Sequence, residues 1–227
     1  MAIALPLALT LGGGGEAPSN TDAATIARSI GMVSAAGCGK VGSGTLVLDG
    51  RYVLTNAHVV VSDSGKVCAN LEVGFSDSFE EEPTTWIDAT VVGKELDGLD
   101  SEGYVTLPDL AVLKLSHRVD QPSIPISAQK LDLNEDITVL GYPGIGGQTI
   151  TSTEGVYAGI DHLNGHAVLK TNADIFPGNS GGAAFNSRGF FIGVPTYRTI
   201  TWDQISELGW LIPAEEAASF LERHVEP

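Results

Sequence analysis

Positive charge is scarce in this chain of 227 residues, which carries 12 Lys and Arg against 28 Asp and Glu, a formal net charge of −16. Proteins that bind nucleic acid or anionic membranes neutralise phosphate groups with clustered basic side chains. The charge balance therefore excludes nucleic acid as a partner. Long apolar runs are also lacking, and none approaches the roughly 20 residues of a membrane-spanning helix. We therefore expect no membrane-spanning segment.

Aromatic residues are few, at 7 % of the chain, whereas Gly and Pro number 28 and 11. This composition predicts many tight turns and leaves little room for long helices. Hydrophobic residues still make up 43 % and charged residues 18 %. That much apolar surface excludes a disordered chain, and the length fits one large all-β domain or two small lobes.

Cysteine is nearly absent, with only Cys38 and Cys68. Neither a Cys-x-x-Cys pair nor a histidine cluster accompanies them, so zinc is not expected. Two alternatives remain for the pair. A disulfide would stabilise the fold by about 3–4 kcal/mol in the chain-entropy model, and the other alternative is two buried thiols.

The first 20 residues differ from the rest of the chain in composition. An apolar run at 2–11 precedes glycines at 12–15 and has the length of a signal-peptide hydrophobic region, but no Lys or Arg precedes Arg28. We expect residues 1–20 to be a leader or a disordered linker. Together with the cysteines, they favour a secreted or periplasmic (cell-envelope) location.

Short β-branched runs with Gly, Asp, Asn or Pro between them indicate a β-sandwich or β-barrel. The predicted strands are residues 45–48, 52–55, 71–75, 90–92, 110–115, 137–140, 148–152, 156–160, 167–170, 189–195 and 209–212. Helical patterns occur at 21–30 and at 213–224, and the second has the charge polarity that the helix dipole favours.

A polar segment with two prolines at residues 116–128 indicates a linker between two halves, 21–120 and 121–227. Residues 76–109 are interpreted as loop-rich and acidic. A cation site at 97–102 matches no calcium-loop spacing, so a solvated acidic loop is the favoured interpretation.

The most informative stretch is FPGNSGG at residues 176–182. Acyl transfer needs a backbone that approaches the developing oxyanion closely and points amide hydrogens at it. The amides of Gly178 and Ser180 are placed to do this, and the following glycines keep side chains away from the substrate. A glycine-rich turn with no further role is the alternative.

Two other segments favour catalysis. His58 follows a predicted strand directly, and Asp109 stands at the head of another, where a buried carboxylate needs a hydrogen-bond partner such as a histidine N–H. Taken singly, His58 is equally consistent with an idle imidazole and Asp109 with an exposed turn residue. The three together, in the order His, Asp, Ser, indicate nucleophilic catalysis.

At these residues the sequence resembles the trypsin-like serine proteases, and specifically their HtrA/Deg branch. The resemblance rests on GSGT at 42–45, TNAHVV at 55–60, DLAV at 109–112, GNSGG at 178–182, and residues 141–156. It extends over roughly residues 25–222.

The resemblance implies an all-β fold of two six-stranded antiparallel β-barrels with the active site in the cleft between them and a short C-terminal helix. His58 and Asp109 would come from the N-terminal barrel and Ser180 from the C-terminal barrel. The implied activity is that of a serine endopeptidase acting on protein or peptide substrates through an acyl-enzyme, with Gly178 and Ser180 as the oxyanion hole. No metal or cofactor is implied.

The sequence departs from the family pattern at several points. Residue 179 is Asn where digestive enzymes have Asp, and no Ile-Val-Gly-Gly start is present, so their zymogen switch is not expected. The 227 residues end directly after the predicted helix, so no PDZ domain is expected. Cys38 and Cys68 flank the His58 strand much as a disulfide does in secreted relatives.

By the same resemblance, six residues would line the substrate cleft: Asp174, Ile175, Phe176, Thr196, Tyr197 and Arg198. Asp174 at the pocket base would favour Arg or Lys at P1, the substrate residue before the scissile bond. In HtrA relatives this loop instead forms a pocket for small aliphatic residues, which suits Ile175 and Phe176. We favour aliphatic P1.

Two rival functions remain. Gly178-x-Ser180-x-Gly182 formally matches the nucleophile elbow of α/β-hydrolases, with Asp203 and His224 following, but that pattern needs a helix after the serine. The other rival is a trypsin-like fold used only for binding. The sequence does not indicate an oligomeric state.

Overall fold

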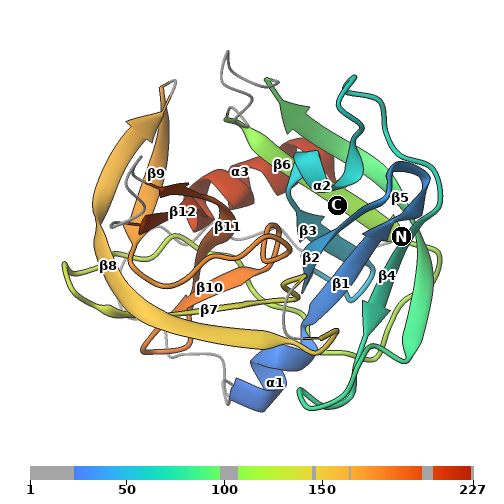
Figure 1. Cartoon of the computed structure of the whole chain (residues 1–227), viewed down its shortest axis with the longest axis horizontal. Helices are drawn as coiled ribbons and strands as arrows, with labels where there is room; N and C mark the ends of the chain where they lie inside the picture. Colours follow the sequence, from blue (N-terminus) through green and yellow to red (C-terminus); the bar gives the residue numbers. More distant parts are fainter. Residues whose placement is uncertain (1–22, 98–106, 145–146, 164, 201–206, 226–227) are drawn as a thin grey trace, which may run out of the picture.

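A computed structural model describes residues 23–97, 107–144, 147–163, 165–200 and 207–225 (Figure 1). The side chains of residues 23, 197–200 and 207 are not described. The predicted leader at 1–20 therefore lies outside the described residues, as does most of the acidic segment 97–102. Within the described ranges, the helices are all too short or too polar to cross a membrane.

The N-terminal half forms a closed antiparallel barrel, in which the strands are ordered β1-β2-β3-β6-β5-β4. These strands are β1 (Ile30–Ala35), β2 (Lys40–Val47), β3 (Tyr52–Thr55), β4 (Leu71–Phe75), β5 (Thr85–Leu96) and β6 (Asp109–Leu115). The turn η1 (Ala36–Cys38) joins β1 to β2, and one helical turn, α2 (Ala57–Val60), follows β3.

The C-terminal half forms a second closed antiparallel barrel, ordered β10-β11-β12-β9-β8-β7, beside the first (Figure 1). Its strands are β7 (Asp136–Gly141), β8 (Thr151–Leu163), β9 (His166–Thr171), β10 (Ala183–Asn186), β11 (Phe191–Ile200) and β12 (Glu207–Pro213). The predicted fold of two six-stranded barrels is confirmed.

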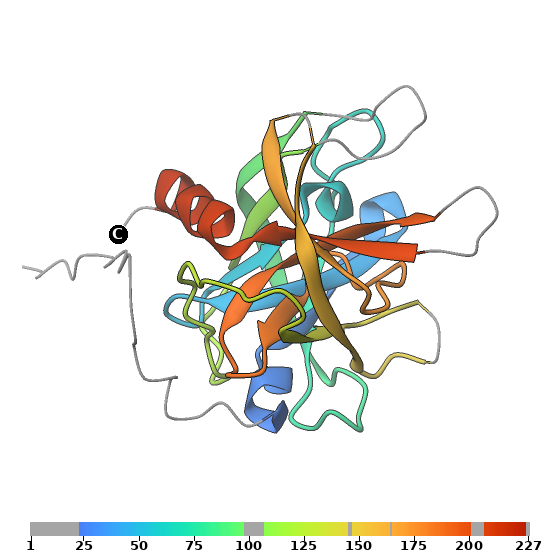
Figure 2. The same cartoon turned by 90° about the vertical axis from the view of Figure 1, so that its left-hand side faces the viewer.

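Two helices flank the barrels, α1 (Ala23–Arg28) and α3 (Ala214–His224), and α3 lies at the outer edge of the molecule (Figure 2). Arg223 and His224 in its last turn reach the N-terminal barrel, where both hydrogen-bond to Glu95 of β5 at 2.9–3.1 Å. Burial acts to raise the pKa of Glu95, but the hydrogen bonds from His224 and Arg223 outweigh it and lower that pKa. The helix therefore ties the two barrels together.

The segment 76–109, interpreted as loop-rich and acidic, contains the long strand β5. This strand includes the predicted strand 90–92, and the loop interpretation is wrong for residues 85–89 and 93–96. Ile87 and Ala89 of this strand are buried, whereas the intervening Asp88 is exposed. The acidic residue thus lies on the solvent face of an alternating strand, where it is compatible with β-structure.

Residues 151–152 and 156–160 of two predicted strands belong to one continuous strand, β8, which begins at Thr151, so the predicted strand residues 148–150 lie outside it. Gly155, which lies between the two predicted strands, is part of β8. A Cβ at this position would lie 2.3 Å from the backbone nitrogen of Ala173, so the close packing here requires glycine. Gly159 has φ +110° at a bulge in the pairing with β9. Both glycines therefore serve bending and close packing rather than a turn.

Cys38 and Cys68 form a disulfide, with their Cα atoms 5.6 Å apart. It joins η1 to the segment before β4, and the segment it encloses contains β3 and α2. Of the two alternatives, the structure therefore has the disulfide rather than two buried thiols.

We expect protein isolated from an oxidising compartment to contain no free thiol. Because the disulfide restricts the unfolded chain, Cys38→Ser together with Cys68→Ser should lower the free energy of unfolding by about 3–4 kcal/mol. Intact mass after alkylation, with and without reductant, measures the thiols, and denaturant titration measures the stability. Two alkylated cysteines without reductant would contradict the pairing.

Candidate active site

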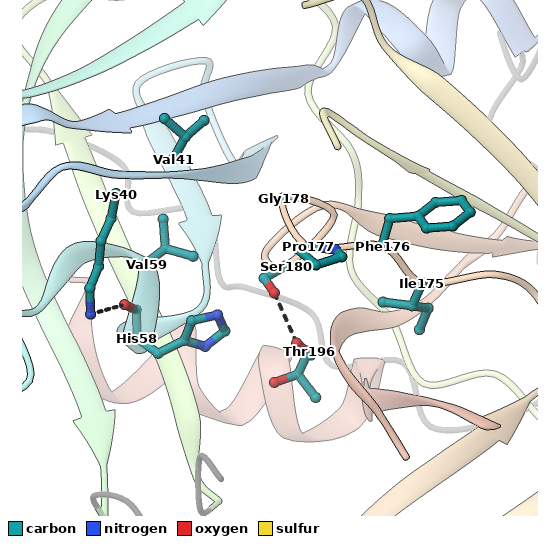
Figure 3. Close-up of a pocket in the computed structure, with 10 residues that line it drawn as sticks. All are labelled: Lys40, Val41, His58, Val59, Ile175, Phe176, Pro177, Gly178, Ser180 and Thr196. Carbon is teal, nitrogen blue, oxygen red and sulfur yellow. Dashed lines mark hydrogen bonds between the residues drawn. The ribbon is translucent and has the colours of Figure 1, made fainter. Parts of the chain in front are cut away.

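His58 lies on α2, directly after β3 (Figure 3). The apolar neighbours Ala57, Val59 and Val60 are buried in the N-terminal barrel and anchor this helical turn. The His58 side chain remains 27 % exposed. The local sequence therefore fixes the backbone of the histidine while leaving its ring at the surface of the cleft.

Asp109 is the first residue of β6 and is fully buried. Its Oδ1 accepts a hydrogen bond from the His58 backbone N–H at 2.9 Å, and its Oδ2 lies 2.7 Å from His58 Nδ1. The hydroxyl of Thr196 also donates to Oδ2, at 2.9 Å. Because a carboxylate only accepts, Nδ1 carries the proton, which leaves Nε2 of the neutral ring as an acceptor.

Ser180 lies in the loop between β9 and β10, within the same pocket as His58 (Figure 3). Its hydroxyl donates to the backbone carbonyl of Thr196 at 2.9 Å rather than to the His58 ring. Thr196 thus contacts two of the three predicted residues: its side chain binds Asp109 and its carbonyl accepts from Ser180.

Within residues 178–182, two amides have no hydrogen-bond partner in the described part of the chain, those of Gly178 and Ser180. The amides of residues 179, 181 and 182 all donate to backbone carbonyls at 2.9–3.0 Å. The carbonyl of Pro177 accepts from the Gly144 N–H at 2.9 Å. Since a trans peptide points its N–H away from its C=O, this directs the Gly178 N–H away from Gly144.

Residue 178 must be glycine in this loop. Its φ is +104°, a region that other residues rarely adopt. A Cβ there would also lie 2.5 Å from the carbonyl oxygen of Tyr142. The two free amides, at residues 178 and 180, are those that the sequence analysis predicted as the oxyanion hole.

A pocket of about 450 Å³ connects these groups. It is lined by Lys40, Val41, His58, Val59, Ile175, Phe176, Pro177, Gly178, Ser180 and Thr196. Ile175, Phe176 and Thr196 were predicted to line the substrate cleft, and all three line this pocket. Lys40 and Val41 were missed, although they directly precede the GSGT motif.

The other predicted cleft residues do not contribute to the pocket in the same way. Asp174 is exposed and does not line it, and its backbone carbonyl accepts from the Thr153 hydroxyl at 2.7 Å. Tyr197 and Arg198 pair with β12 through their backbones, but their side chains lie outside the described set. Among the described residues, no three His, Cys, Asp or Glu side chains cluster as metal ligands.

The α/β-hydrolase alternative is wrong. The residues after the serine form the strand β10 instead of a helix, and both sheets are antiparallel barrels. His224 binds Glu95 at 2.9 Å and does not line the Ser180 pocket. Asp203 lies outside the described residues.

Comparisons with known proteins agree with this fold. The family model of the trypsin-like peptidase domain matches residues 42–194, more than half of the chain. A solved serine endoprotease from Yersinia pestis superposes with a TM-score of 0.67 at 26 % identity, covering 88 % of this chain and 63 % of that one.

Two curated relatives are proteases. The chain is 28 % identical over 195 residues to the serine endoprotease DegS of Escherichia coli, covering 81 % of this chain and 48 % of DegS. It is 30 % identical over 188 residues to the serine protease Do-like HtrA of Lactococcus lactis, covering 76 % of this chain and 41 % of that protein. The chain thus spans about half the length of these relatives or less. It belongs to the trypsin-like peptidase family and is a protease domain of the HtrA type.

Proposed function

We propose that this chain is a serine endopeptidase that cleaves peptide bonds through an acyl-enzyme intermediate. The observation that carries the proposal is the hydrogen bond between the buried carboxylate of Asp109 and His58 Nδ1, together with the position of His58 and Ser180 in one pocket. Asp109 holds the tautomer in which His58 Nε2 is basic, so Nε2 accepts the proton of the Ser180 hydroxyl as its oxygen attacks the carbonyl.

The unpartnered amides of Gly178 and Ser180 stabilise the oxyanion of the tetrahedral intermediate. The protonated His58 then gives its proton to the leaving amine. In the second half of the reaction, His58 Nε2 takes a proton from a water molecule as that water attacks the acyl group. His58 then gives this proton to the Ser180 oxygen as the bond between that oxygen and the acyl carbon breaks.

One adjustment precedes attack. The Ser180 hydroxyl donates to the Thr196 carbonyl in this structure, so it must turn to His58 Nε2 when substrate binds. Catalytic hydrogen bonds are often made only in the substrate complex. The substrate is proposed to be an extended or unfolded polypeptide, running beside residues 196–198 of β11.

The disulfide supports the proposal that the protein works outside the cytoplasm, in the cell envelope or secreted. Structural disulfides persist in oxidising compartments and are rare where glutathione and thioredoxin keep thiols reduced. Cys38 and Cys68 are both committed to this bond, with neither left free.

Ser180→Ala should abolish hydrolysis of an unfolded protein such as casein, because no other group takes over the attack. Its thermal stability should change by less than about 1 kcal/mol, since only one hydroxyl at a polar site is lost. Hydrolysis of casein by Ser180→Ala at the wild-type rate would contradict the role of Ser180.

Asp109→Asn tests the tautomer argument. The amide keeps the shape of the side chain but offers an N–H to His58, so Nε2 is no longer the free base. We expect kcat to fall by roughly 10⁴-fold. Asp88→Asn, a carboxylate on the solvent face of β5, is the matched control and should retain full activity. Equal rates in the two variants would contradict the assignment.

A further prediction concerns P1 preference. Because Ile175 and Phe176 line the pocket and Asp174 is exposed, we expect cleavage mainly after Val, Ala or Ile in a denatured proteome. Asp174→Ala should change this profile little, whereas Phe176→Ala should widen the pocket and admit larger P1 residues. A dominant Arg or Lys signal that collapses in Asp174→Ala would overturn this prediction.

A further inference from the structure

We infer that Ser43 is a positioning residue for the oxyanion hole: its hydroxyl holds the Gly178 peptide so that the amides of Gly178 and Ser180 face the substrate carbonyl. This inference rests on the proposed peptidase function. The GSGT motif has two polar side chains, Ser43 and Thr45, and the mechanism above assigns a role to neither.

Every polar atom of Ser43 is engaged, although the residue is fully buried. Its hydroxyl donates to the carbonyl of Gly178 at 2.7 Å and accepts from the Tyr142 N–H at 2.8 Å. Its N–H donates to the Ser180 carbonyl at 2.8 Å, and its carbonyl accepts from the Thr55 hydroxyl at 2.6 Å. Ser43 therefore connects β2 to two separate loops of the C-terminal barrel.

These contacts fix the peptide planes around the free amides. The Gly144 N–H holds the carbonyl before Gly178, and the Ser43 hydroxyl holds the carbonyl after it. A glycine at φ +104° rotates at little steric cost, so its orientation has to come from such anchors. Because both carbonyls are held, the direction of the Gly178 N–H is fixed.

No other side chain among the described residues bonds to the carbonyls of Gly178 or Ser180. The neighbouring Asn179 is fully buried, yet its amide oxygen and nitrogen have no hydrogen-bond partner among the described protein atoms. The side chain of Asn179 thus does not hold the loop, and that role falls to Ser43.

Close packing accounts for the glycines on both sides of Ser43. A Cβ on Gly42 would lie 2.7 Å from the Val59 side chain and 3.2 Å from the Ser180 carbonyl oxygen. A Cβ on Gly44 would lie 2.4 Å from Val53. Gly42 therefore lets β2 approach the catalytic loop closely enough for Ser43 to bond to it, whereas Gly44 makes room for Val53 of β3 in the same barrel.

Thr45 provides a matched control. It lies two residues further along β2, is also fully buried, and donates its hydroxyl to the Gly182 carbonyl at 3.1 Å. This bond joins the same strand to the same loop, but beyond the two amides. Ser43→Ala and Thr45→Val each remove one buried hydroxyl, and only the first frees the Gly178 peptide.

The experiment compares the wild type, Ser43→Ala and Thr45→Val by kcat and KM on a peptide substrate, by affinity for a peptide boronate, and by the pH dependence of kcat/KM. Removing an oxyanion donor outright lowers kcat by roughly 10²–10³-fold, so a loosened donor should lower it by roughly 10–100-fold. We expect this loss in Ser43→Ala with KM within about twofold, a parallel loss of boronate affinity, and an unchanged pH midpoint. The kcat of Thr45→Val should stay within about threefold of the wild-type kcat.

The outcomes separate the two claims. A folded wild type that hydrolyses no peptide or casein contradicts the proposed function itself. An active wild type with equal kcat in Ser43→Ala and Thr45→Val overturns the role of Ser43, as does a loss carried by KM or by a shifted pH midpoint. If Ser43→Ala does not fold, Ser43→Cys replaces it, because the thiol fills the space but hydrogen-bonds weakly. If the kcat of Ser43→Cys then equals that of Thr45→Val, the inference is overturned as well.

Discussion

The proposed active site depends on the burial of one carboxylate. Asp109 is completely removed from solvent, and a buried charge is costly unless donors satisfy it. The His58 backbone and ring supply two of those donors from the N-terminal barrel, and the Thr196 hydroxyl supplies the third from the C-terminal barrel. The carboxylate is fully satisfied only when the barrels are docked, so the same contacts assemble the site and join the two halves.

Contacts between the barrels also hold the loop of Ser180, the proposed nucleophile. The loop that carries Ser180 belongs to the C-terminal barrel, yet Ser43 of β2 hydrogen-bonds to it from the N-terminal barrel. On the outer surface, Glu95 holds the end of α3 through Arg223 and His224. The relative placement of His58 and Ser180 is therefore fixed by contacts between barrels rather than within either one.

Much of this arrangement could be predicted from the sequence. The β-branched runs indicated an all-β fold, and local motifs singled out His58, Asp109 and Ser180. Long-range packing was harder to read: Gly155 suggested a turn but lies inside β8, because its missing side chain makes room for Ala173. The hydrogen bonds of Ser43 and Thr196 could not be predicted from the sequence either, because they join residues far apart in the chain.

The central claim is that Ser180 is a nucleophile activated by His58. Labelling with a fluorophosphonate probe, followed by peptide mapping, tests it most directly, because the probe reacts with an activated serine and no substrate need be known. We predict a single adduct on Ser180 in the wild type and none in a folded His58→Ala variant. A folded wild type without an adduct, or an adduct on Ser180 that forms equally without His58, would contradict the account.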